Sequence, residues 1–218
     1  MIRIPDGLHY RCYLLACDPR TGRLFDRTRT AFLTRAAVLS QLAIAGEVTE
    51  ADGVVRSAAR ASVSDTPLEL ALSQIDSRAR SWKAWLRRGY KETLAGTERA
   101  LQEAGILNAE RHRRFGQLTT THVQLVEASF ARQLSDQARA ILTGSTPPGE
   151  LDATEAALAA LPALVEVPAV ASRQDRKRYH HRIELLTEQM TPFAPGLPAA
   201  LRGLKMTMIA AHGGLGGS

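Results

Sequence analysis

Apolar residues recur every three or four positions through residues 30–45, and this spacing places them on one side of an α-helix. Gly46 follows directly, and glycine commonly ends a helix because it tolerates the left-handed backbone found there. The pattern therefore predicts a strong helix over 30–45. Its apolar positions are Leu33, Ala37, Leu39, Leu42, Ala43 and Ile44.

Similar patterns predict helices over most of the remaining chain. Thr66 and Pro67 are typical of a helix start, since threonine caps first-turn N–H groups and proline suits the first helical position. Gly105 is typical of a helix end, and Asp152 of a helix start. The predicted helices cover residues 66–75, 82–89, 90–104, 129–144, 152–164, 173–189 and 199–211.

Three segments have the composition of β-structure. Residues 8–17 are rich in β-forming side chains and predict a strand. Residues 47–59 predict a hairpin that turns at Asp52-Gly53, and residues 111–126 predict a second hairpin with its turn near 119–122. The predicted fold class is mainly α, as a single globular domain over 1–218 with a few short β-hairpins and an ordered core over about 8–211.

Composition supports this assignment and restricts where the protein works. Aromatic residues are only 5% of the chain, so the core has to be built mainly from Leu, Ala, Val and Ile, which favours helices. No apolar run reaches the length of a membrane span, and the first residues lack the pattern of a signal peptide. Cys12 and Cys17 would lie on opposite faces of the predicted strand, unable to pair, which fits a reducing cytoplasm. We therefore expect a cytoplasmic protein that associates with a membrane peripherally.

The sequence has no familiar arrangement of catalytic or metal-binding residues. It contains no HExxH or CxxC spacing, no serine in a nucleophile elbow and no glycine-rich phosphate loop followed by a helix. His180 and His181 are adjacent on a charged helix, so their side chains point in different directions. We therefore expect no enzyme activity, no catalytic residues, no metal and no cofactor.

Charge gives the clearest indication of a partner. Lys and Arg number 28 against 22 Asp and Glu, for a net charge of +6. This charge favours acidic partners, such as an anionic lipid, an acidic protein or nucleic acid, and arginine grips phosphate with a planar fork of donors. Two basic clusters precede or begin apolar helices, whose N-termini favour anions. They are Arg20, Arg23, Arg27, Arg29 and Arg35, and Lys83, Arg87, Arg88 and Lys91.

Two further basic clusters have different interpretations. The basic residues of 173–182 alternate with acidic ones, as on a solvated helix face. Arg111, Arg113 and Arg114 lie beside apolar residues of the hairpin predicted over 111–126. That hairpin is expected to insert shallowly into a membrane or to mediate self-association, with ordinary packing as the alternative. The apolar residues are Phe115, Leu118, Val123 and Leu125.

Four motifs, in their order and spacing, resemble the Golgi phosphoprotein 3 family. They are YLLACDPRTGRL, LTRAAVLSQLAIAGEV, LQEAGIL and LTTTHV, and the resemblance extends over about residues 10–211. It implies a mostly helical domain that binds phosphatidylinositol 4-phosphate at a membrane and acts as an adaptor for the tails of membrane proteins, without enzyme activity. The Ala- and Arg-rich composition resembles the bacterial, especially the actinobacterial, members.

The resemblance also implies a lipid headgroup site. Two of its residues match basic positions of the family, and three neighbours are expected to assist. The matching residues are Arg35 and Lys91, and the assisting neighbours are Arg27, Arg29 and Arg88. Asp26 stands where the family has a tryptophan, and Leu94 stands where it has a further basic residue. These two departures leave the identity of the lipid open.

Several functions remain compatible with the sequence. The leading one is a non-enzymatic peripheral membrane protein that binds anionic, phosphoinositide-like headgroups and acts as an adaptor, with a protein partner, a membrane-protein tail or a second copy of itself. A protein–protein scaffold that has lost lipid binding is favoured by Asp26 and Leu94. A nucleic-acid binder is less favoured, because no recognition motif or interleaved aromatic pattern occurs. A biosynthetic-pathway protein that acts on a small molecule would need a deep pocket lined by perturbed ionisable groups.

Overall fold

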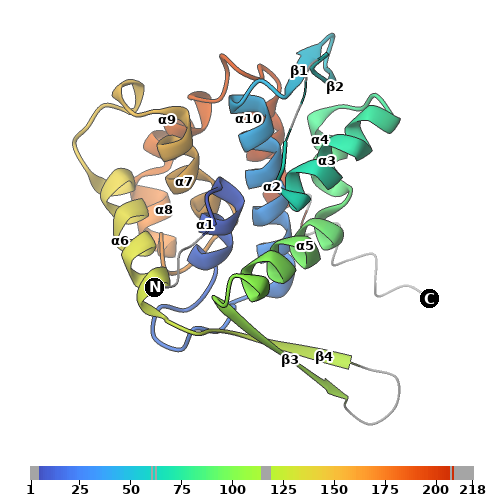
Figure 1. Ribbon diagram of the computed structural model, residues 1–218. Coiled ribbons are helices and arrows are strands. Elements are labelled where there is room, and N and C mark those ends of the chain that lie inside the picture. The colour runs from blue at the N-terminus through green and yellow to red at the C-terminus, as the bar shows by residue number, and fades with distance from the viewer. Residues whose placement is uncertain (1–4, 60, 62, 114–118, 207, 209–218) are drawn as a thin grey trace.

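The helix α2 (Arg27–Ile44) lies at the centre of the computed structural model, which describes residues 5–59, 61, 63–113, 119–206 and 208 (Figure 1). Most of α2 is buried on every side, as expected for a helix surrounded by others. Asp26 caps its N-terminus by accepting a 2.8 Å hydrogen bond from the Arg29 N–H, and Gly46, with a φ of +72°, follows its C-terminus. The helix predicted over 30–45 is therefore confirmed and begins about one turn earlier.

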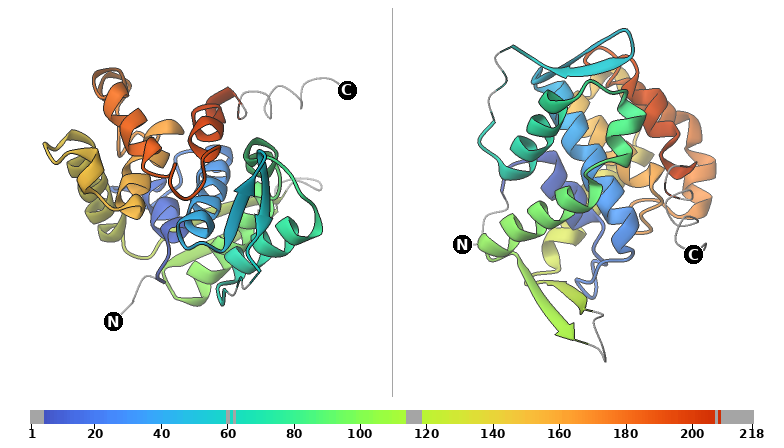
Figure 2. Two further views of the ribbon diagram at one scale, coloured as in Figure 1. Left: turned by 90° about the horizontal axis from the view of Figure 1, so that it is seen from above. Right: turned by 90° about the vertical axis from the view of Figure 1, so that its right-hand side faces the viewer.

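Other helices surround α2 in two groups (Figures 1 and 2). One group contains α1 (Leu8–Leu15), α6 (Ser129–Thr143), α7 (Ala153–Leu164), α8 (Arg173–Arg178) and α9 (His180–Glu188), with the 3-10 turn η1 (Pro148–Glu150) before α7. The other contains α3 (Thr66–Ser77), α4 (Trp82–Arg87) and α5 (Tyr90–Glu103), and α10 (Leu197–Arg202) contacts both groups through α4 and α7. Buried side chains from both groups form one continuous apolar cluster. The mainly α fold class is thereby confirmed.

No helix in the described part of the chain combines the length and the apolar composition needed to cross a bilayer.

The strand predicted over 8–17 is wrong, because most of this segment forms the helix α1. All of its helical residues except Arg11 are buried, between α2, α6 and α7. A short segment that is buried on almost every side shows neither helical nor strand periodicity. The strand is predicted from the β-forming residues alone, and these do not exclude a helix. Cys12 and Cys17 are free and buried, and burial raises the pKa of both thiols.

The first predicted hairpin is confirmed. Strands β1 (Val48–Ala51) and β2 (Val54–Ser57) pair antiparallel. Asp52 and Gly53 connect them with φ values of +52° and +72°, the conformation that Asp-Gly favours in a two-residue hairpin turn.

The second hairpin is present, but its turn is not where the sequence placed it. Strands β3 (Leu107–Arg113) and β4 (Thr119–Leu125) pair in a register that joins Leu107 to Leu125 and Arg113 to Thr119. Residues 119–122, the predicted turn, therefore belong to β4, as the β-branched run of threonines favours. The hairpin projects away from the helices, while its base is held by a 3.0 Å hydrogen bond from the Leu125 N–H to the Gly22 carbonyl (Figure 1).

Two predicted helices differ in extent. The charged helix predicted over 173–189 is divided at Tyr179 into α8 and α9. Of these two helices, α9 has buried residues, among them Ile183 and Leu186, and α8 has none. Packing against α7 therefore fixes the direction of α9 but not that of α8. The helix predicted over 199–211 begins earlier, as α10, which ends at Arg202, and residues 204–206 are helical again after Gly203.

Candidate functional site

The basic residues expected at the headgroup site do not meet in one pocket. The three on α2 point to different places: Arg27 to α5, Arg29 to the end of α7, and Arg35 into the interior. Arg88 and Lys91 lie where α4 ends and α5 begins. Of the three arginines on α2, only Arg35 forms hydrogen bonds to residues that flank this junction. The structure therefore places Arg35 near Arg88 and Lys91, and it places Arg27 and Arg29 elsewhere.

Arg35 is fully buried, with 0% of its surface exposed. Its guanidinium donates to three neutral acceptors: the Trp85 carbonyl oxygen at 3.1 Å, Thr93 Oγ1 at 3.2 Å and Gln74 Oε1 at 3.1 Å. Burial lowers the pKa of Arg35 to about 10, so the group is still charged at neutral pH. Arg35 thus places a positive charge inside the protein, tying α2 to α3, α4 and α5.

Arg27 and Arg29 are each occupied by carboxylates. Arg27 makes two hydrogen bonds of 2.7 Å to Glu98, which is buried and also accepts from the Tyr13 hydroxyl at 3.1 Å. Arg29 bonds Glu166 at 2.9 Å and lies 3.8 Å from Asp26. Because these partners neutralise both guanidinium groups, neither is available as a simple anion ligand.

The junction of residues 87–91, called here the α4–α5 corner, carries exposed positive charge. Arg87, Arg88 and Lys91 are exposed, and none of them has a carboxylate partner among the described residues. No side chain caps the N-terminus of α5, so its first N–H groups remain available to an anion. Tyr90 stacks on Phe32 of α2 at 4.3 Å between ring centroids, which fixes the corner to the central helix.

Gly89 connects the corner to Arg35. Its φ is +72°, and a Cβ there would lie 2.5 Å from Gln74 Oε1, which accepts from Arg35. We expect Gly89→Ala to lower the free energy of unfolding by about 2–3 kcal/mol, of which about 1 kcal/mol is the cost of the left-handed backbone. Gly46→Ala is the control, because its φ is also +72° but nothing lies within 4 Å of the added Cβ. If urea denaturation gives the same loss of unfolding free energy for both variants, the contact between the added Cβ and Gln74 costs nothing, which would contradict the prediction.

The two positions that depart from the family have structural roles. Leu94 is buried in the main apolar cluster at 4% exposure, and Asp26 is the N-cap of α2. Neither residue faces the α4–α5 corner as a headgroup ligand. Both positions serve the helical fold.

The apolar hairpin residues are divided between two regions. Val123 and Leu125 lie at the base of the hairpin and are buried in the core at 7% and 5% exposure. Phe115 and Leu118 lie outside the described residues, as does Arg114. Val123 and Leu125 therefore serve packing, the alternative interpretation of this segment, and do not form an exposed apolar surface.

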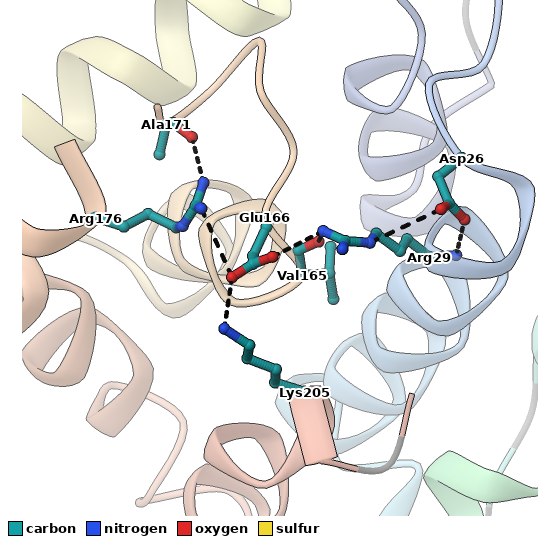
Figure 3. A network of polar contacts seen from close by, with 7 residues as sticks. All are labelled: Asp26, Arg29, Val165, Glu166, Ala171, Arg176 and Lys205. Carbon is teal, nitrogen blue, oxygen red and sulfur yellow. Dashed lines mark hydrogen bonds and ion pairs between the residues drawn. The ribbon is translucent and has the colours of Figure 1, made fainter. Parts of the chain in front are cut away.

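A second basic region lies around Glu166 and was not foreseen as a site (Figure 3). The Glu166 carboxylate accepts from Lys205 at 2.8 Å and Arg29 at 2.9 Å and lies 3.6 Å from Arg176. The hydrogen bonds from Lys205 and Arg29, with the charge of Arg176, lower the pKa of Glu166. The pocket beside it has a volume of about 710 Å³ and is lined by Glu166, Arg173, Arg176, Lys177, His180 and Lys205.

One signal for this pocket was present in the sequence. Residues 173, 176, 177 and 180 have the i, i+3, i+4, i+7 spacing that gathers side chains on one helix face. No local pattern could add Glu166 or Lys205, because they are brought there by tertiary structure.

The fold and these surfaces define a mainly α-helical protein with a projecting β-hairpin and two basic regions, on opposite sides of α2. The family model for Golgi phosphoprotein 3 matches residues 8–203, so the chain belongs to the Golgi phosphoprotein 3 family. A comparison with curated proteins finds none that matches the chain.

Proposed function

We propose that the protein is a non-enzymatic, cytoplasmic adaptor that associates peripherally with membranes by binding anionic, phosphoinositide-like headgroups at the α4–α5 corner. Membership of the family suggests a role like that of Golgi phosphoprotein 3. The observation that carries the proposal is the unneutralised charge of Arg87, Arg88 and Lys91 beside the uncapped start of α5.

The corner has the elements of a phosphate site. Each exposed cation near an anionic membrane contributes about 1 kcal/mol of binding free energy. The N–H groups at a helix start add donors and a favourable dipole. Together these supply an attraction that is selective for negative charge and weakened by salt.

Arg35 has a different role in this proposal from Arg88 and Lys91. Because it is fully buried, it does not contact a headgroup but holds Trp85 and Thr93, which flank the corner. Among the described residues no carboxylate forms an ion pair with it, although the charge of Glu92 interacts with it favourably, and its charge adds to the positive potential above it. Arg35 is thus a positioning residue.

The test is co-sedimentation with phosphatidylcholine vesicles that contain graded phosphatidylserine or phosphatidylinositol 4-phosphate, at low and physiological salt. We expect the wild type to bind anionic vesicles, and the double variant Arg88→Glu, Lys91→Glu to bind at least about thirtyfold more weakly, since two contributions of about 1 kcal/mol are lost. Both residues are exposed, so the fold is expected to be retained.

The matched control is the double variant Arg132→Glu, Arg178→Glu. It changes the net charge by the same amount, and Arg178 lies over a tyrosine ring as Lys91 does. Both residues are exposed, on helices α6 and α8, across the molecule from the corner (Figure 1). If the two variants weaken vesicle binding equally, the loss depends on net charge and not on the position of the corner. A wild type that stays in the supernatant with every vesicle would contradict the lipid proposal and favour a protein–protein scaffold.

A further inference from the structure

We propose that the pocket beside Glu166 is a second, separate anion site, which binds a phosphate monoester group. It is lined by residues from three parts of the chain: Glu166, two residues after α7, the segment of α8 with the start of α9, and Lys205 after α10. Its volume of about 710 Å³ is within the range of pockets that hold small ligands.

The charges around this pocket are unbalanced. Four cations line it, and Glu166 is its one lining carboxylate. Glu166 is already engaged by Lys205 and Arg176, and by Arg29 from the side of α2 (Figure 3). Arg173 and Lys177 have no carboxylate partner among the described residues. Gathering like charges costs free energy, and a bound anion would remove that cost.

Glu166 keeps part of the site in place before any ligand binds. It has a φ of +63°, which turns the chain as it leaves α7 and directs the carboxylate at Lys205 and Arg176. Arg176 is also fixed by a 2.8 Å hydrogen bond to the Ala171 carbonyl oxygen. Cations that are already positioned lose less conformational entropy when a ligand arrives, so binding is favoured.

The donors fit a phosphate monoester better than a single carboxylate. Arginine offers a planar fork to two phosphate oxygens, and lysine offers a point charge to a third. A monoester carries close to two negative charges above its second pKa of about 6, which matches the two lining cations, Arg173 and Lys177, that have no carboxylate partner among the described residues. This chemistry is shared by soluble phosphate esters and by phosphomonoester lipid headgroups.

The experiment uses isothermal titration calorimetry of the full chain with glycerol 3-phosphate, at constant ionic strength and at a pH above the second phosphate pKa. The same proteins are then sedimented with phosphatidylcholine vesicles that contain phosphatidic acid. Binding of the soluble ester assigns the site to a soluble ligand. Binding of the vesicles by the corner variant Arg88→Glu, Lys91→Glu, without binding of the soluble ester, assigns it to a lipid. Absence of both overturns the proposal.

The decisive variant is Arg173→Gln, Lys177→Gln, which removes two exposed cations that do not bond Glu166. We expect the dissociation constant for the phosphate monoester to rise at least about tenfold. The control Arg132→Gln, Arg178→Gln is expected to bind as the wild type does, and equal weakening by both variants would overturn the proposal. The α4–α5 corner variant Arg88→Glu, Lys91→Glu should retain calorimetric binding of glycerol 3-phosphate, so failure of this site and of the corner are distinguishable.

Discussion

Replacement of Arg35 by alanine is expected to lower the free energy of unfolding by about 3–5 kcal/mol, the largest effect of any single change considered. The side chain is fully buried and donates to acceptors on three helices. Alanine would leave a cavity and would remove the Arg35 donor from the Thr93 hydroxyl, the Gln74 amide oxygen and the Trp85 carbonyl, of which the carbonyl keeps the Arg88 N–H. Urea denaturation followed by circular dichroism measures the loss.

Arg35→Met separates the two causes of this loss. Methionine refills most of the volume but donates nothing, so we expect an intermediate loss of about 1–3 kcal/mol. A change within about 0.5 kcal/mol for Arg35→Ala would show that the buried hydrogen bonds contribute little. Because such variants are expected to be unstable, reduced lipid binding by them would not identify Arg35 as a headgroup contact.

Arg27→Ala is expected to cost about 2–3 kcal/mol. The change removes two hydrogen bonds of 2.7 Å and leaves the buried Glu98 carboxylate with the Tyr13 hydroxyl as its remaining hydrogen-bond partner among the described residues. Breaking a buried ion pair costs about 3–5 kcal/mol of stability. We expect a smaller loss here because the Arg27 side chain is 46% exposed, so water screens part of the interaction.

A double-mutant cycle with Glu98→Gln tests the origin of this loss. Once the carboxylate charge is gone, removing Arg27 should cost less, so we expect a coupling free energy of at least about 1 kcal/mol. Additive losses in thermal or urea denaturation would mean that the two side chains act independently. The cycle therefore measures the pair and not the packing of either residue.

The predictable parts of the fold are those with a local physical cause. The helix α2 has an apolar repeat and a terminal glycine, and the β1–β2 turn has the Asp-Gly pair that its positive φ values require. The α1 segment lacked such a cause, because burial on all sides removes the polar positions that reveal a helix. The division at Tyr179 depends on the packing of α9 against α7, which no local pattern contains.

The candidate site was predictable only in part, for a related reason. The exposed cations Arg88 and Lys91 follow from their cluster in the sequence. Which carboxylate meets each arginine of α2 depends on contacts between residues far apart in the chain, 71 positions for Arg27 and Glu98, and 137 for Arg29 and Glu166. The burial of Arg35 has a signal in the sequence, since a helix with apolar residues on every face leaves its one central arginine no exposed side.

The β3–β4 hairpin is not a detachable module, although it projects from the helices (Figure 2). Val123 and Leu125 fill part of the core, and the Leu125 N–H closes the loop at Gly22, four residues before the cap of α2. Excision of the whole hairpin would therefore open the interior and loosen the entry to the central helix. The root of the hairpin, where Leu107 pairs with Leu125, is therefore part of the core, and a change there acts on the whole domain.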